Sequence, residues 1–380
     1  MYVVLAWARQ VTRQEFVALA TSTYLQFLEE GLRGLIETGD DTAFCAPGHN
    51  GPHLALESSV RNSCHWLLAF AIGHRLYERR DFREAASALA NWVLNSCPYL
   101  VNGGFILRQK DGHDWCNGVI GGAWIIEALV RAGQVLGRGD TLEFAADFYK
   151  RHRFNDTQGA WHRFDVHSGN YRIDATLDHQ AWFAAAAAEL GALEHVERFL
   201  DACQAGAFHV RADGRIHHLF CGRGPRERLL RVLYTAREAR SREAIEELEI
   251  GYHHYTLHPF SRIRRCLPGH SFWRSDGFLS SLAYLSNEWL KRLEGNRFGW
   301  PYNAPGFELP ILIAEFGGHV PLGWSDMSRI FDDQLRRVRS GSRAFCGQST
   351  KDPLTLTARI YELGLFLDAS KAGTAGSTVN

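Results

Sequence analysis

Two carboxylates stand at the starts of apolar helical patterns, each beside indole and imidazole side chains. Asp114 opens the run DWCNGVIGGAWIIEAL, and Asp178 opens the run DHQAWFAAAAAEL. A helix start presents free N–H groups and a positive dipole end, which favour an anionic or hydroxyl-rich ligand. Cleavage of a glycosidic bond uses two carboxylates, one to protonate the leaving oxygen and one to activate water or attack the sugar. We therefore expect Asp114 and Asp178 to form the catalytic pair, with His179 beside them.

Each of these residues also has a purely structural explanation. Asp114 or Asn117 can cap the helix that follows, while the glycines allow close packing. An aspartate is equally expected at the cap before the alanine-rich run at Asp178. Glu308 follows Pro305-Gly306, where the helix dipole alone favours a carboxylate.

Further polar and aromatic residues gather at other junctions between loops and expected helices. Trp66 and Trp182 are expected to stack on sugar rings, while Asn62 and Asn117 orient hydroxyl groups. His217 and His218 alternate faces of an expected strand, so at most one can face a cleft. The expected substrate-binding residues are His49, Asn50, Arg61, Asn62, His65, Trp66, Asn117, Gln180, Trp182, His218, Tyr252, His254, Asn303 and Glu308.

Helical patterns in pairs must position these residues. Thirteen are expected, at residues 12–38, 60–77, 82–95, 114–137, 141–152, 178–190, 194–205, 226–240, 243–255, 276–293, 306–316, 325–338 and 354–367. Short extended pieces are expected at 105–108, 161–165 and 214–220. Helix pairs without a fixed repeat motif predict an all-α (α/α)6 toroid, in which alternate helix ends converge on one mouth.

Composition limits the alternatives. The 380 residues show no linker, so we expect one domain over 1–368 and a disordered tail over 369–380. Lys+Arg and Asp+Glu both number 42, which gives no basic face for nucleic acid. No long apolar run is seen, so we expect no membrane span. No secretory signal is seen and the eight cysteines form no CxxC pair, so we expect a cytoplasmic protein. The sequence does not indicate an oligomeric state.

The runs ESSVRNSCHWLLAF, DWCNGVIGGAWIIEAL, DATLDHQAWFAAAAAEL and YNAPGFELP together resemble the AglQ-like family of (α/α) toroid proteins from surface-polysaccharide gene clusters. The helix pairing and the turn RADGRIHH are more distantly similar to unsaturated glucuronyl hydrolases, which have a six-hairpin glycosidase-like fold. The resemblance implies a sugar substrate and a glycoside hydrolase or lyase. Asp178 departs from the family pattern, in which we expect Asn before the His-Gln pair.

Three short dyads contain side chains that bind zinc, namely Cys64-His65, His113-x-x-Cys116 and His218-x-x-Cys221. WCNG is also similar to the WCYG that holds zinc in lanthionine cyclases, but there the Cys-His pair follows the motif, whereas Cys64-His65 precedes it. No nucleotide-binding or metalloprotease motif is present. We therefore expect no metal and no cofactor.

The main expectation is a glycoside hydrolase acting on a bacterial surface polysaccharide or its oligosaccharides. One alternative is a polysaccharide lyase, in which Asn62 and His179 neutralise a uronate carboxylate and Tyr252 or Tyr255 abstracts a proton. Another is a non-catalytic protein of polysaccharide assembly. A cyclase is a fourth, although Asp40-Asp41 lacks the DxDD spacing for such protonation.

Overall fold

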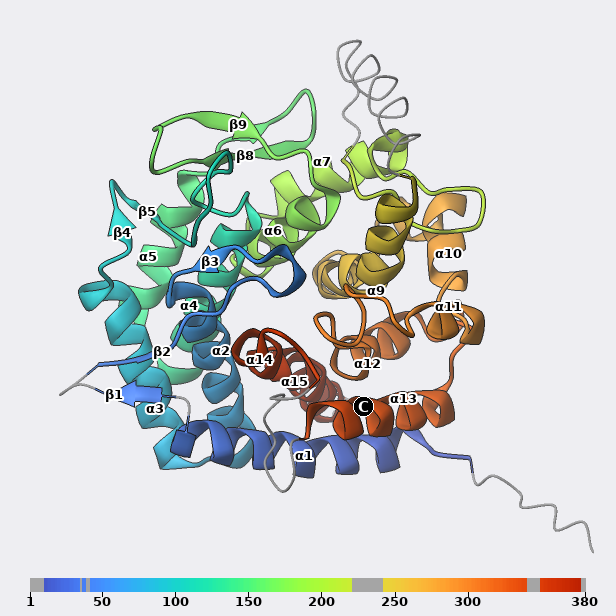
Figure 1. Cartoon of the computed structure of the whole chain (residues 1–380), viewed down its shortest axis with the longest axis horizontal. Helices are drawn as coiled ribbons and strands as arrows, with labels where there is room; N and C mark the ends of the chain where they lie inside the picture. Colours follow the sequence, from blue (N-terminus) through green and yellow to red (C-terminus); the bar gives the residue numbers. More distant parts are fainter. Residues whose placement is uncertain (1–9, 35, 39–41, 221–241, 340–348, 377–380) are drawn as a thin grey trace, which may run out of the picture.

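The inner wall of the molecule is a closed ring of helices. The computed structural model describes residues 10–34, 36–38, 42–220, 242–339 and 349–376. Within them, each inner helix packs against the next and the last returns to the first, as Figure 1 shows. The ring consists of α2 (Val60–Tyr77), α4 (Ile120–Leu136), α6 (Leu177–Glu189), α9 (Arg242–Cys266), α12 (Pro305–Phe316) and α15 (Ile360–Gly376). The predicted all-α toroid is confirmed.

The outer helices are amphipathic and cover this ring. They are α1 (Arg13–Gly34), α3 (Arg80–Asn91), α5 (Gly139–Lys150), α7 (Leu193–Ala202), α10 (Asp276–Ala283), α11 (Asn287–Arg292) and α13 (Trp324–Val338). In α13, for example, Ile330 and Phe331 are buried while Asp332 and Arg336 face solvent. α1 packs on α15 through Phe16 and Phe366, whose ring centroids lie 5.8 Å apart. The short helix α14 (Pro353–Ala358) precedes α15.

The segments that connect the helices contain short antiparallel strands. They are β1 (Ile36–Thr38) with β2 (Ala43–Cys45), β3 (Leu56–Glu57) with β6 (Arg108–Gln109), β4 (Leu100–Val101) with β5 (Gly104–Phe105), and β8 (Ala160–Phe164) between β7 (Phe154–Asn155) and β9 (Tyr171–Ile173). The pairing of β3 with β6 holds the loop before α2 against the segment before α4. Two polar loops that are distant in sequence thereby become neighbours.

Several expected boundaries are wrong. The segment 276–293 is two helices, because Ser286 accepts a hydrogen bond from the Trp289 N–H (3.3 Å) and starts α11. Residues 214–220 make only isolated bridges, at Ile216 and Leu219. α15 continues to Gly376, so residues 369–376 are helical and not a disordered tail. The expected helix 226–240 and Cys221 lie outside the described residues, and the single-domain boundary stays a prediction.

Buried charges occupy the interior of the ring. Arg359 pairs with Glu308 and Glu362, and Arg262 pairs with Glu127 and Glu189. Burial raises the pKa of Glu127 to about 7 and that of Glu362 to about 8, against the opposing effect of the arginines. In the described part of the chain, no helix combines the length and apolar character needed to cross a membrane.

Candidate active site

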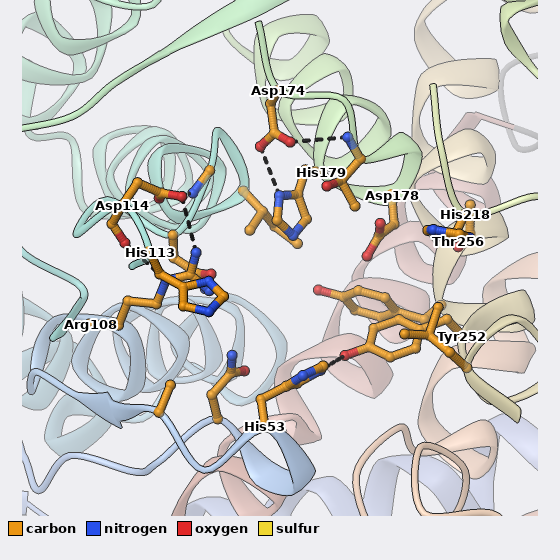
Figure 2. Close-up of a pocket in the computed structure, with 18 of the residues that line it drawn as sticks. His53, Arg108, His113, Asp114, Asp174, Asp178, His179, His218, Tyr252 and Thr256 are labelled. Atoms are coloured by element: carbon orange, nitrogen blue, oxygen red, sulfur yellow. Dashed lines mark hydrogen bonds and ion pairs between the residues drawn. The ribbon is translucent and has the colours of Figure 1, made fainter. Parts of the chain in front are cut away.

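A pocket of about 390 Å³ lies where the loop before α2, the start of α4, the start of α6 and the first half of α9 meet. Figure 2 shows it with His179 and Asp178 projecting from the start of α6 and with His53 on the opposite side. Seven of the expected site residues line it. They are Asn50, Asp114, Asn117, Asp178, His179, His218 and Tyr252.

Other expected residues lie outside the pocket because they hold loops and helices together. The Nδ2 of Asn62 donates to the Ala46 carbonyl (3.0 Å), and the Nδ2 of Asn303 donates to the Gly251 carbonyl (3.0 Å). The amide of Gln180 bonds the backbone of Trp161 and the Asp174 carbonyl. The His49 Nε2 lies 2.6 Å from the Lys351 carbonyl oxygen. These side chains position the site without lining it.

A third group is buried among other core side chains. His65 packs against Tyr361 in a tilted arrangement (4.5 Å between centroids), and Trp182 stacks on His258 (5.2 Å). Trp66 packs against Phe70. The remaining members are Arg61, His254 and Glu308, all buried. The proposed stacking of sugar on Trp66 and Trp182 has no geometric support, because both indoles are in the core.

His179 forms a dyad with Asp174. The His179 Nδ1 lies 2.8 Å from the Asp174 Oδ2, which also accepts the Val119 N–H (2.9 Å), while Oδ1 accepts the Thr176 N–H (3.0 Å). Burial opposes the charge on the imidazole, but the Asp174 carboxylate outweighs it and raises the pKa of His179. These bonds likewise overcome burial and lower the pKa of Asp174. The dyad fixes the ring with Nδ1 on the carboxylate, which leaves Nε2 for a ligand.

Asp178 differs from Asp174 in its surroundings. Its side chain faces the pocket, and the one hydrogen bond that acts on its pKa comes from its own backbone N–H. Burial is the largest effect on it and raises the pKa of Asp178 above its ordinary value, although His179 opposes this. One pocket therefore holds two carboxyl groups whose pKa values are shifted in opposite directions, lowered for Asp174 and raised for Asp178.

Asp114 is a fully engaged carboxylate. Its Oδ1 accepts the Gly118 N–H (2.7 Å), and its Oδ2 accepts from Arg108 (3.1 Å) and Arg163 (2.7 Å). Burial opposes the charge, but Arg108, the Gly118 amide and Arg163 together lower the pKa of Asp114. The helix cap that the sequence suggests is thus a clamp that holds two guanidinium groups at the pocket.

The expected site residues did not include several residues that line the pocket. His53 lies 2.8 Å from the Tyr252 hydroxyl through its Nε2, and burial, Lys110 and Arg108 lower the pKa of His53 to about 4. Arg163 comes from β8. The other omitted pocket residues include His113, Asp174, Glu249 and Tyr302, whereas Tyr255 was expected only as a base in the lyase alternative. The spacing of Asp174 before the Asp178-His179 pair was the one available signal for the dyad.

Potential metal ligands come together at one place in the described part of the chain. His217, His218 and Glu249 place ligand atoms within 4.8 Å of one another. Glu249 is also bound by Arg211 (2.5 Å) and lies 3.4 Å from Arg215. Two guanidinium groups on this carboxylate compete with a cation, so this donor set does not suit a metal ion. The Cys64-His65 pair is buried in the core.

The comparisons with known proteins agree with this architecture. No family model matches the chain. It is 30% identical over 336 residues to archaeal glycosylation protein Q of Haloferax volcanii, covering 83% of this chain and 90% of that protein.

Three solved structures illustrate the shared fold. Cellobiose 2-epimerase from Bacillus thermoamylovorans has a TM-score of 0.59 at 11% identity, over 92% of this chain and 99% of that chain. An unsaturated glucuronyl hydrolase specific for heparin has a TM-score of 0.55 at 10% identity, over 95% and 98%. A family 76 glycoside hydrolase from a bovine Bacteroides thetaiotaomicron strain has a TM-score of 0.56 at 7% identity, over 92% and 78%. At these identities the likeness shows the fold alone.

Proposed function

The chain belongs to the family of archaeal glycosylation protein Q, and from this premise we propose that it is a carbohydrate-active enzyme, a glycoside hydrolase acting on an anionic sugar of a surface polysaccharide or its oligosaccharides. The observation that carries the proposal is the convergence of Asp178 and the His179–Asp174 dyad on one pocket. These groups are a proton donor and an oriented imidazole, which acid–base cleavage of a glycosidic bond requires.

In the proposed reaction, the protonated carboxyl of Asp178 gives its proton to the glycosidic oxygen as the bond to the sugar carbon breaks. Neutral His179 takes a proton from the attacking water through Nε2, and Asp174 stabilises the resulting imidazolium. Asp114 is a weak base because four donors already engage its oxygens, namely the Gly118 N–H, the Cys116 thiol, Arg108 and Arg163. We therefore assign Asp114 to positioning Arg108 and Arg163, and not to the catalytic pair expected from the sequence.

The charge balance of the pocket supports an anionic sugar. Arg108 and Arg163 share the single charge of Asp114. The Lys110 Nζ donates to a neutral group, the His53 carbonyl (2.9 Å). This side of the pocket thus carries surplus positive charge, and burial together with these cations lowers the pKa of His113. A carboxylate on the substrate would balance that surplus.

A second candidate is sugar epimerisation or isomerisation. His53 and His179 both line the pocket, and the charge of His179 acts on the pKa of His53. Two imidazoles that flank a sugar can remove and return a proton on a carbon beside a carbonyl. The lyase is less favoured, because burial raises the pKa of Tyr252 and of Tyr255 and makes a phenolate base costly.

The test is release of reducing ends from bacterial polysaccharides with and without uronate, comparing wild type with Asp178→Asn. We expect the variant to lose about 10²- to 10⁴-fold in kcat, the usual contribution of general acid–base catalysis. Asp147→Asn on α5, whose side chain is 68% exposed, removes an aspartate charge outside this pocket and should leave the rate unchanged. Release by Asp178→Asn at the wild-type rate would refute the assignment.

The same samples separate the alternatives. Exchange of a carbon-bound sugar proton in D2O without reducing-end release would favour epimerisation. A new ultraviolet absorbance from an unsaturated uronate would favour the lyase.

A further inference from the structure

Asn50 lies on the wall of the pocket with its amide orientation fixed from behind. Its Oδ1 accepts from the Arg61 Nη1 (3.0 Å) and from the Tyr302 hydroxyl (2.6 Å). A guanidinium group can only donate, so the amide atom that faces Arg61 must be the oxygen. The usual ambiguity between the oxygen and nitrogen of an asparagine is thereby resolved. Nδ2 must be the atom on the other side.

The groups that hold Asn50 are themselves immobilised. Arg61 is 2% exposed, is ion-paired with Glu57 (3.0 Å) and lies over the Trp124 ring at 4.1 Å. Tyr302 is buried. The backbone of Asn50 is left-handed (φ 58°, ψ 42°), a conformation that Asn tolerates better than most residues. An amide held this firmly loses little conformational entropy when it binds a ligand. The hydrogen bond it makes therefore contributes more fully to the difference in affinity between ligands.

The Nδ2 of Asn50 has no hydrogen-bond partner among the residues that the structure describes, although Oδ1 has two. A ligand with an oxygen opposite a fixed N–H donor on a pocket wall forms a hydrogen bond with it and binds more tightly. A ligand that lacks this oxygen leaves the donor unpaired and binds more weakly. We propose that Asn50 is a specificity-determining residue that donates a hydrogen bond from Nδ2 to one oxygen of the bound sugar. This inference rests on the proposed function only in that the pocket binds a sugar.

The experiment measures binding without turnover. Dissociation constants are determined by calorimetry for D-glucuronate, for its analogues that each lack one hydroxyl, and for D-glucose, which lacks the carboxylate. We expect one analogue to bind wild type at least tenfold more weakly than D-glucuronate does. In Asn50→Gly that same analogue should bind as well as D-glucuronate, because the donor that distinguishes them is gone. Glycine suits the positive φ at residue 50, so the backbone should be kept.

A matched control separates this role from a structural one. Asn102 in the turn between β4 and β5 is exposed and has nearly the same φ, 52°. Asn102→Gly should keep the wild-type discrimination. If Asn50→Gly keeps every affinity ratio of wild type, or if no sugar in the series binds wild type, the inference is overturned. Discrimination that depends on Asn50 without any reducing-end release would sustain it and refute the hydrolase.

Discussion

Gly118 touches the His179–Asp174 dyad, and Gly118→Ala should break it. The backbone of Gly118 has φ +65°, and a Cβ there would lie 2.0 Å from the Asp174 Oδ2 and 2.3 Å from the His179 Nδ1. Neither atom can stay where it is at such distances. Because Asp174 is also fixed by the Val119 and Thr176 amides, the side chains must separate instead of moving together.

The size of the effect follows from two contributions. A non-glycine residue in the left-handed region costs roughly 1–2 kcal/mol. Loss of a hydrogen bond to a charged group adds about 1.5–3 kcal/mol. Gly169→Ala isolates the first contribution, because Gly169 has φ +67° and a Cβ added there would meet no other atom within 4 Å. We expect Gly118→Ala to be less stable than Gly169→Ala by about 1.5–3 kcal/mol.

Urea unfolding of both variants measures this difference, and an NMR titration of His179 reports the dyad directly. Since the Asp174 carboxylate raises the pKa of His179, its separation from the ring should lower that pKa in Gly118→Ala but not in Gly169→Ala. Equal stabilities of the two variants together with an unchanged titration of His179 would show that the contact of Gly118 with the dyad has no such consequence.

Two further predictions concern pH. The bonds from His218 and Arg211 overcome burial and lower the pKa of Glu249 from 4.5 to about 2, so its stabilising contribution is present above pH 4.5 and is lost as pH falls toward 2. Urea unfolding at pH 5 and pH 3 should therefore show a smaller loss of folding free energy in Glu249→Gln than in wild type. An equal loss in both proteins would contradict this prediction. Burial raises the pKa of Glu127 to about 7, so its contribution to folding stability is present below pH 4.5 and is lost as pH rises through 7. Glu127→Gln should therefore reduce the fall in stability between pH 5 and pH 8. The same substitution at the exposed Glu288 should leave that fall unchanged.

The fold and the helix starts could be predicted because both depend on local patterns. Paired apolar periodicities indicated the toroid, and the aspartates before the runs at α4 and α6 placed Asp114, Asp178 and His179 at one pocket. The direction in which an inner helix presents its side chains could not be predicted. Such a helix is buried on all sides, so its periodicity does not distinguish the pocket from the core, and His65, Trp182 and His254 point into the core. Arg163 and His53 depend on strand pairing and loop geometry, which leave no periodic signal.

The closure of the ring by α15 has a consequence for synthesis. α2 and α1 bury apolar surface against α15, which is the last inner helix to be made. While the nascent chain is still on the ribosome, that surface has no native partner, and the contacts of greatest sequence separation must form last. We therefore expect chaperones to bind the chain until α15 has been made and has covered this apolar surface.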